Sequence, residues 1–98
     1  MRVYIIYTEY NNQEYDLLNI GRLETAAEYL FTRIYSEEFK EANDDDRINL
    51  YLAEADISRE DFKVLADNID EDEVSNILQK IDLGPDTRII HTVNGGDS

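Results

Sequence analysis

The sequence contains no cysteine and no tryptophan, a single proline, a single histidine and only four glycines. Without cysteine the chain has no disulfide, no thiolate nucleophile, no iron–sulfur cluster and no cysteine-ligated zinc. No apolar run approaches the ~20 residues that span a bilayer. The start, MRVYIIYTEY, is too short and too polar for a signal peptide. We therefore expect a cytoplasmic protein.

Basic residues are also scarce. Nine lysines and arginines face 23 aspartates and glutamates, so the net charge is −14. Such a chain repels DNA, RNA and anionic lipid, so we expect no direct nucleic-acid binding and no membrane binding. The charge favours a basic partner protein, a cation, or solubility alone. The 98 residues, 42% of them hydrophobic, suffice for one domain with one core.

The first half of the chain predicts a β–β–α unit. Residues 2–10 are β-branched and aromatic, with apolar side chains on both faces, which is typical of a central strand. Residues 15–23 predict a return strand after a turn at 11–14, with a bulge or kink at Gly21. TAAE at 25–28 matches a capping box, with Thr25 as the N-cap of a helix that runs to about residue 41.

The second half predicts mostly helix. Residues 47–55 fit a strand or a helix, and we lean slightly to helix. Ser58 is expected to cap one helix, and the acids at 70–73 are expected to begin another, which ends before GP at 84–85. Residues 87–93 predict a last strand. The expected fold is α+β: one domain over 1–93, with a small antiparallel sheet (the N-terminal hairpin plus the C-terminal strand) and three or four helices on one face, and a flexible tail at 94–98.

Constellations that carry catalysis are missing. His91 lies in the last expected strand, with no second histidine or any cysteine to form a zinc site or a nucleophile–base pair. No glycine-rich loop follows a strand, so nucleotide-binding motifs are excluded. DNIDEDE at 67–73 is dense in oxygen ligands but fails the EF-hand spacing, which leaves a weak divalent site as the alternative. We expect no enzyme activity, no cofactor and no metal.

Acidic residues are concentrated in one region. Residues 37–73 contain 15 acidic and four basic residues, whereas the flanks are close to neutral. Solubility alone does not require such clustering. Carboxylates three or four residues apart on a helix lie about 5–6 Å apart and form rows comparable to nucleic-acid phosphates. We predict a partner-binding surface composed of Glu37, Glu38, Glu41, Asp44, Asp45, Asp46, Glu60, Asp61, Asp67, Asp70, Glu71 and Asp72.

Tyrosines are concentrated in the expected hairpin. Four of the seven in the chain, Tyr4, Tyr7, Tyr10 and Tyr15, lie there. Because tyrosine is enriched at interface hot spots, these four residues form a second candidate interface. Such an interface could join two copies of the chain into a homodimer through the N-terminal hairpin. The alternative is that the rings form cross-strand pairs within the domain.

The acidic run EEFKEANDDD…EADISRED…DNIDEDE, in a small α+β chain without cysteine, resembles the phage-encoded inhibitors that include anti-CRISPR and anti-restriction proteins. Several members of that class mimic DNA. The resemblance is one of class and matches no family motif. It implies a non-enzymatic inhibitor that occupies a basic, nucleic-acid-binding surface of a partner in the host cytoplasm. The alternatives are an antitoxin or immunity protein that neutralises a basic toxin, and an acidic structural domain without inhibitory role.

Overall fold

The computed structural model describes residues 1–11, 14–39 and 48–94, apart from the side chains of residues 38 and 39. Its elements are β1 (Arg2–Tyr10), β2 (Glu14–Gly21), α1 (Glu24–Ile34), η1 (Tyr35–Phe39), β3 (Ile48–Asp56), α3 (Arg59–Asp67), α4 (Glu71–Asp82) and β4 (Arg88–Asn94). The four strands form one antiparallel sheet in the order β2-β1-β3-β4. The expected α+β class is confirmed.

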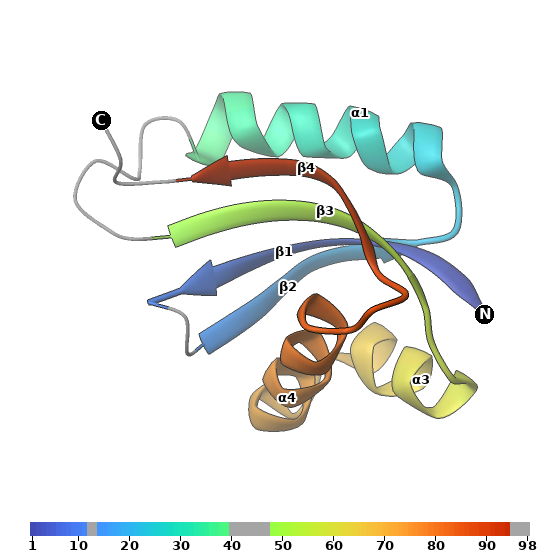
Figure 1. Cartoon of the computed structure of the whole chain (residues 1–98). Coiled ribbons are helices and arrows are strands. Elements are labelled where there is room, and N and C mark those ends of the chain that lie inside the picture. The colour runs from blue at the N-terminus through green and yellow to red at the C-terminus, as the bar shows by residue number, and fades with distance from the viewer. Residues whose placement is uncertain (12–13, 40–47, 95–98) are drawn as a thin grey trace.

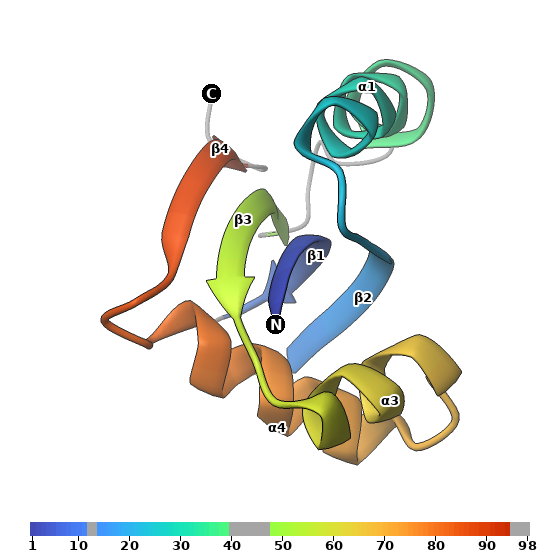
Figure 2. The same ribbon diagram turned by 90° about the vertical axis from the view of Figure 1, so that its right-hand side faces the viewer.

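Helices cover both faces of this sheet. Figure 1 shows α1 above the strands and the α3–α4 pair below them. Figure 2 shows the same layers along the strands, with β4 at one edge and β2 at the other. None of the helices within 1–11, 14–39 and 48–94 is long and apolar enough to cross a membrane.

The central strand β1 explains this arrangement. Its side chains alternate between the two faces, so that Ile5 and Tyr7 enter one core and Ile6 enters the other. The core below the sheet includes Leu65 of α3 and the buried stripe of α4, which consists of Val74, Ile77, Leu78 and Ile81. The core above the sheet is smaller and includes Ala27 and Phe31 of α1.

The expectation that all helices pack on one face is therefore wrong. A strand with apolar residues on both faces must be covered on both, because either uncovered row would leave large side chains in water. The sequence of residues 2–10 already carried this information.

The slight preference for helix at residues 47–55 is also wrong. The segment forms β3, whose nine residues from Ile48 to Asp56 all pair with β1. Leu50 and Leu52 enter the upper core, whereas Ala53 and Ala55 enter the lower one. Helix propensity is a weak prior, and burial between two strands overrides it.

Two helix starts are confirmed and one is wrong. Ser58 Oγ accepts a hydrogen bond from Asp61 N at 3.1 Å and caps α3, and Asp70 caps α4 by accepting from the backbone N–H groups of residues 72 and 73. Thr25 is not a cap, because α1 begins at Glu24 with Leu23 as its N-cap, and that position makes no side-chain cap bond. The sequence TAAE at 25–28 therefore lies within the first turns of α1 and forms no capping box.

Smaller differences concern the edges of elements. The return strand is β2, and its bulge is at Leu18, which lies between the paired residues Leu17 and Asn19, rather than at Gly21. The helix expected to reach residue 41 is α1 followed by the π-helical turn η1; residues 40 and 41 lie outside the described residues. The last strand is confirmed as β4, which includes Asn94, the first residue of the expected tail.

Stability measurements distinguish a helix start with a side-chain cap, as in α3, from one without, as in α1. Ser58→Ala should lower the free energy of unfolding by ~1 kcal/mol, because the N–H of Asp61 loses its acceptor. Thr25→Ala should cause no comparable loss, because no cap bond is removed. Urea unfolding followed by circular dichroism gives both values, and equal losses would contradict this assignment of the caps.

Candidate functional site

The described carboxylates divide into two groups, those with a partner and those without. Glu54 belongs to the first group, since it accepts hydrogen bonds from Tyr4 Oη at 2.8 Å and Arg88 Nε at 3.3 Å. These hydrogen bonds, that of Arg88 foremost, hold the pKa of Glu54 below its usual range. The other ion pairs among the described residues are Arg2–Glu54, Glu24–Arg88, Glu37–Arg33, Asp61–Lys80 and Asp56 with the Met1 ammonium. Glu28 Oε1 lies 3.4 Å from His91 Nε2.

Most carboxylates without such a partner gather at one end of the molecule. Within the described part of the chain they form no ion pair and receive no hydrogen bond from another side chain, and all of them are exposed. We call this set the carboxylate end: Glu14, Asp16, Asp67, Asp70, Glu71, Asp72 and Glu73. Two further unpaired carboxylates, Glu60 and Asp86, lie elsewhere.

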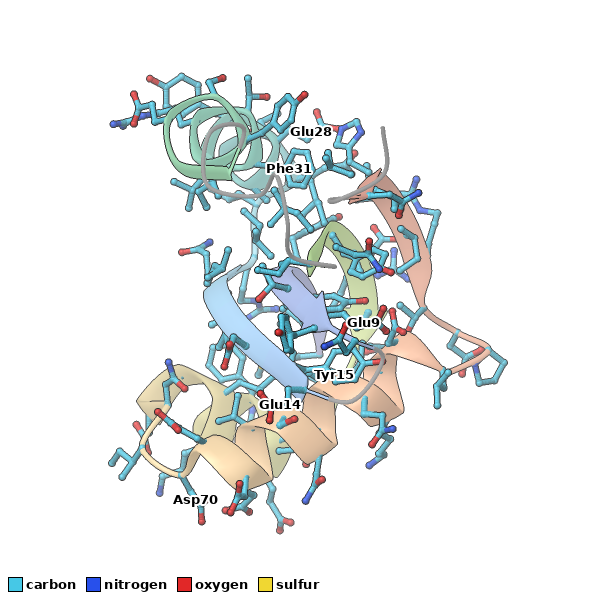
Figure 3. All side chains as sticks on the ribbon, turned by 90° about the vertical axis from the view of Figure 1, so that its left-hand side faces the viewer. Glu9, Glu14, Tyr15, Glu28, Phe31 and Asp70 are labelled. Atoms are coloured by element: carbon cyan, nitrogen blue, oxygen red, sulfur yellow. The ribbon has the colours of Figure 1, made fainter. Side chains whose placement is uncertain are left out.

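The carboxylate end joins the start of β2 to the start of α4. A hollow of about 170 Å³ is lined by Glu14 and Asp16 from the strand and by Glu71 and Asp72 from the helix. Tyr15 N donates to Ser75 Oγ at 3.2 Å and ties the two elements together there. Figure 3 shows Glu14 and Asp70 on the side of the sheet opposite to Glu28.

Local folding explains part of this charge. The turn between α3 and α4 passes through Asn68 in the left-handed conformation, and Asp70 then caps α4. Acids in the first turn of a helix are favoured by its dipole, each by ~0.3–1 kcal/mol. The dipole equals only about half a charge, so it does not account for four carboxylates at 70–73. It gives no reason for Glu14 and Asp16, and it disfavours Asp67 at the end of α3.

Of the twelve acidic residues predicted for partner binding, four lie together on one surface of the described structure. Asp67, Asp70, Glu71 and Asp72 belong to the carboxylate end. Glu60 and Asp61 lie in the first turn of α3, and Asp61 is half-buried against Lys80. Glu37 lies in η1, directly after α1, and Figure 1 shows α1 on the face of the sheet opposite to α3 and α4. Nothing is described for the side chain of Glu38, and Glu41, Asp44, Asp45 and Asp46 lie outside the described residues.

The second candidate interface, the tyrosines of the hairpin, is divided between buried and accessible side chains. Tyr7 and Tyr15 are 0% and 4% exposed, and only Tyr10 is exposed among the four. Tyr4 is half-buried and donates to Glu54. The rings of Tyr7 and Tyr15 instead form a cross-strand contact with centroids 6.1 Å apart. The alternative, a cross-strand contact within the domain, therefore holds for Tyr7 and Tyr15.

Tyr15 and two residues of β3 contact a buried carboxylate. Glu9 is 6% exposed and is the only buried charged residue in the described part of the chain. Tyr15 Oη donates to Glu9 Oε2 at 2.7 Å, while Asn49 Nδ2 and Tyr51 Oη donate to Glu9 Oε1 at 3.2 and 3.3 Å. Asp82 of α4 completes the group, since its Oδ1 accepts from Tyr7 Oη at 2.6 Å. We call Tyr7, Glu9, Tyr15, Asn49, Tyr51 and Asp82 the tyrosine–carboxylate cluster.

This cluster changes the acidity of its phenols. Burial, followed by the hydrogen bond to Asp82, raises the pKa of Tyr7 far above its ordinary value. Burial, followed by the hydrogen bond to Glu9, does the same for the pKa of Tyr15. Burial and the charge of Glu9 raise the pKa of Tyr51 to about 12. Phenolate is disfavoured because it would lie in a poorly solvated site beside carboxylates.

Sequence reasoning missed this cluster, although two signals pointed to it. Glu9 shares the alternate-residue face of Val3, Ile5 and Tyr7, so a central strand must bury it. Asp82 follows Leu78 by four residues and therefore lies on the buried stripe of α4. The carboxylates at positions 14 and 16 were missed because their place beside α4 is a tertiary contact.

His91 packs on α1, with its ring stacked on Phe31 at a centroid distance of 5.3 Å. No group of three or more His, Asp or Glu side chains within 1–11, 14–39 and 48–94 is arranged to hold a metal ion. The chain matches no protein-family model, and no curated protein or solved structure matches it.

The phenols of the tyrosine–carboxylate cluster make alkaline unfolding predictable. Unfolded tyrosines ionise near pH 10, whereas Tyr7, Tyr15 and Tyr51 stay protonated in the folded protein at that pH. A raised folded-state pKa means that the unfolded state loses protons first, so stability falls as the pH rises above about 10. Tyrosinate absorbance and circular dichroism, recorded on the same samples, should show a step of tyrosine ionisation that coincides with unfolding.

Substitutions assign that step. Tyr51→Phe should reduce its amplitude, whereas Tyr29→Phe, a change at a ring that is 67% exposed, should not. Complete ionisation of all seven tyrosines before any loss of circular dichroism would show that the cluster is open to solvent.

Proposed function

We propose that this protein is a non-enzymatic binding protein whose carboxylate end docks onto a basic surface of a partner protein. The observation that carries the proposal is the division of the charges. Among the described residues, the carboxylates elsewhere are mostly paired, whereas seven exposed ones at a single end are not. Like charges held together in this way cost stability through repulsion, and a cationic partner surface would relieve that cost.

The form of the proposal that we favour is an inhibitor of a protein that binds nucleic acid. Carboxylates from the first turn of α4 and from the start of β2 lie around one hollow. A dense row of anions is what a nucleic-acid-binding groove recognises. By occupying that groove, the protein would act as a DNA mimic of the anti-CRISPR or anti-restriction type. The mechanism is steric and electrostatic exclusion, and it needs no catalytic residue and no cofactor.

A comparison of two charge-neutralised variants tests the proposal. The first replaces Glu14, Asp16, Asp67, Glu71 and Asp72 with their amides. The matched control removes the same number of charges elsewhere, at Glu24, Glu28, Glu37, Asp56 and Asp86. Exposed ion pairs contribute only about 0–1 kcal/mol each, so the control should fold normally. Both variants and the wild-type protein serve as bait in host lysate at about 50 and 200 mM salt.

The wild-type protein and the control should retain a basic protein at low salt and lose it at high salt. The first variant should not retain it at either salt. Added DNA duplex should displace the captured protein if its docking surface binds nucleic acid. Capture that resists the duplex would instead favour neutralisation of a basic toxin. Equal loss from both variants would show that net charge alone drives binding, and equal retention would exclude the carboxylate end as the interface.

A further inference from the structure

The two edges of the sheet are protected to different degrees. β2 forms one edge and β4 the other, and each pairs with a single neighbouring strand. An edge strand presents unpaired backbone N–H and C=O groups that another strand can bind. Proteins usually prevent this with charged side chains, with a bulge or with a covering element. The edge at β2 is protected in all three ways, whereas the edge at β4 has only a bulge.

The edge at β2 is closed to a further strand. Glu14 and Asp16 place two exposed carboxylates on it. The N–H of Tyr15 already donates to Ser75 Oγ of α4 at 3.2 Å. The bulge at Leu18 interrupts the regular pairing of the strand. A strand that approached this edge would meet negative charge, an occupied donor and an irregular backbone.

The edge at β4 is open. No backbone hydrogen bond joins residues 88–94 to a described residue outside the ladder with β3. Five of the seven residues of β4 are exposed. Figure 2 shows this strand as the outermost of the coloured elements on its side of the molecule. The bulge at Ile90 leaves residues 91–94 in regular pairing with residues 49–52, so a straight open segment remains.

β4 also differs from the other elements in charge. It contains Arg88 and His91 but no aspartate or glutamate, whereas each of the other described strands and helices contains at least one. Residues 87–96 are the longest stretch of the sequence without an acidic residue. Glu24 and Glu54, which lie beside this edge, form ion pairs with Arg88. Two copies of a chain with a net charge of −14 repel each other, and this repulsion is weakest at the acid-free edge.

We propose that the edge at β4 binds a second copy of the chain, β4 against β4 in antiparallel orientation, so that the two sheets become continuous. The strand is complementary to itself in this orientation, because residues directly opposite each other in an antiparallel pair point to the same face. His91 and Val93 pair with Leu52 and Leu50 on the face of the upper core, and Thr92 points to the other face. A pairing centred on Thr92 therefore sets His91 opposite Val93 of the second copy, and the two Thr92 side chains opposite each other.

This pairing agrees with the charges on both copies. Opposed threonines are favourable across strands, and no two like charges lie opposite each other in residues 91–93. A strand from a basic protein would gain no charge attraction at this edge, because β4 carries no carboxylate. Since β2 is at the far edge of each sheet, Glu14 and Asp16 would lie on the two outer sides of the dimer. The carboxylate ends then stay accessible, and the dimer does not depend on the function proposed for them.

Sedimentation equilibrium of the wild-type protein tests the proposal. The mean mass should rise above the 11.4 kDa of one chain, towards twice that value, as the concentration is raised to about 1 mM. Added salt should strengthen this association, because it screens the repulsion between two copies of equal charge, whereas docking onto a basic surface weakens with salt. A mass that stays at 11.4 kDa at every concentration and salt would overturn the proposal.

Thr92→Lys tests whether β4 is the surface involved. It sets two lysines opposite each other at the centre of the pairing, and edge lysines are one of the devices that prevent strands from pairing. The dimer dissociation constant should rise by about tenfold or more, because like charges brought together at an interface are strongly unfavourable. Thr25→Lys, the same change at an exposed position of α1, is the control and should dimerise as the wild-type protein does. Equal dissociation constants for the two variants would overturn the proposal.

Hydrogen exchange keeps the proposal testable if Thr92→Lys does not fold. In the wild-type protein, the backbone amides on the open side of β4 should exchange more slowly at about 1 mM than at about 10 μM protein. The amides of β2 should exchange equally at both concentrations. Exchange in β4 that does not change in a sample shown to be dimeric would place the interface elsewhere and overturn the proposal.

Discussion

The burial of β1 on both of its faces is the constraint on which the rest of the structure depends. β1 lies between β2 and β3, and its alternate side chains enter two separate cores. One core requires α1, and the other requires α3 and α4 (Figure 1). A chain of 98 residues that builds two cores around one strand keeps little interior for polar groups. Nearly all of its charge must therefore lie on helices, turns and strand ends.

Glu9 is the exception, and it shows what an interior charge requires. β1, the strand that enters both cores, carries this carboxylate near its end. Four side chains from three strands donate hydrogen bonds to Glu9 or to Asp82. Two of the three phenols, Tyr7 and Tyr15, were predicted from the sequence as part of an interface, yet both are buried. The tyrosine richness of the hairpin is thus a property of folding, whereas its acids Glu14 and Asp16 belong to the exposed carboxylate end.

The features that sequence reasoning predicted correctly are those set by neighbouring residues. The central strand, the Ser58 cap, the start of a helix at the acids of 70–73 and the last strand follow from alternation, side-chain chemistry and turn residues within a few positions of each other. The errors at β3 and at the helix placement are different, because they depend on what packs across the sheet. Likewise, the acidic region at 37–73 was visible as composition. Which of its carboxylates are paired is a tertiary property, since Glu37 finds Arg33 one turn away and Asp61 finds Lys80 on another helix.

The central claim is that the carboxylate end is not required by the fold. Three of its members, Glu14, Asp16 and Asp67, lie outside the first turn of α4, so the helix dipole gives them no support. The most direct test is the free energy of unfolding of the variant with all three changed to amides, measured at low and at high salt. The variant should be more stable than the wild-type protein at low salt, and the difference should shrink at high salt as repulsion is screened. A variant that is less stable than the wild-type protein at low salt would show that these carboxylates support the fold, and would remove the reason to assign them a partner.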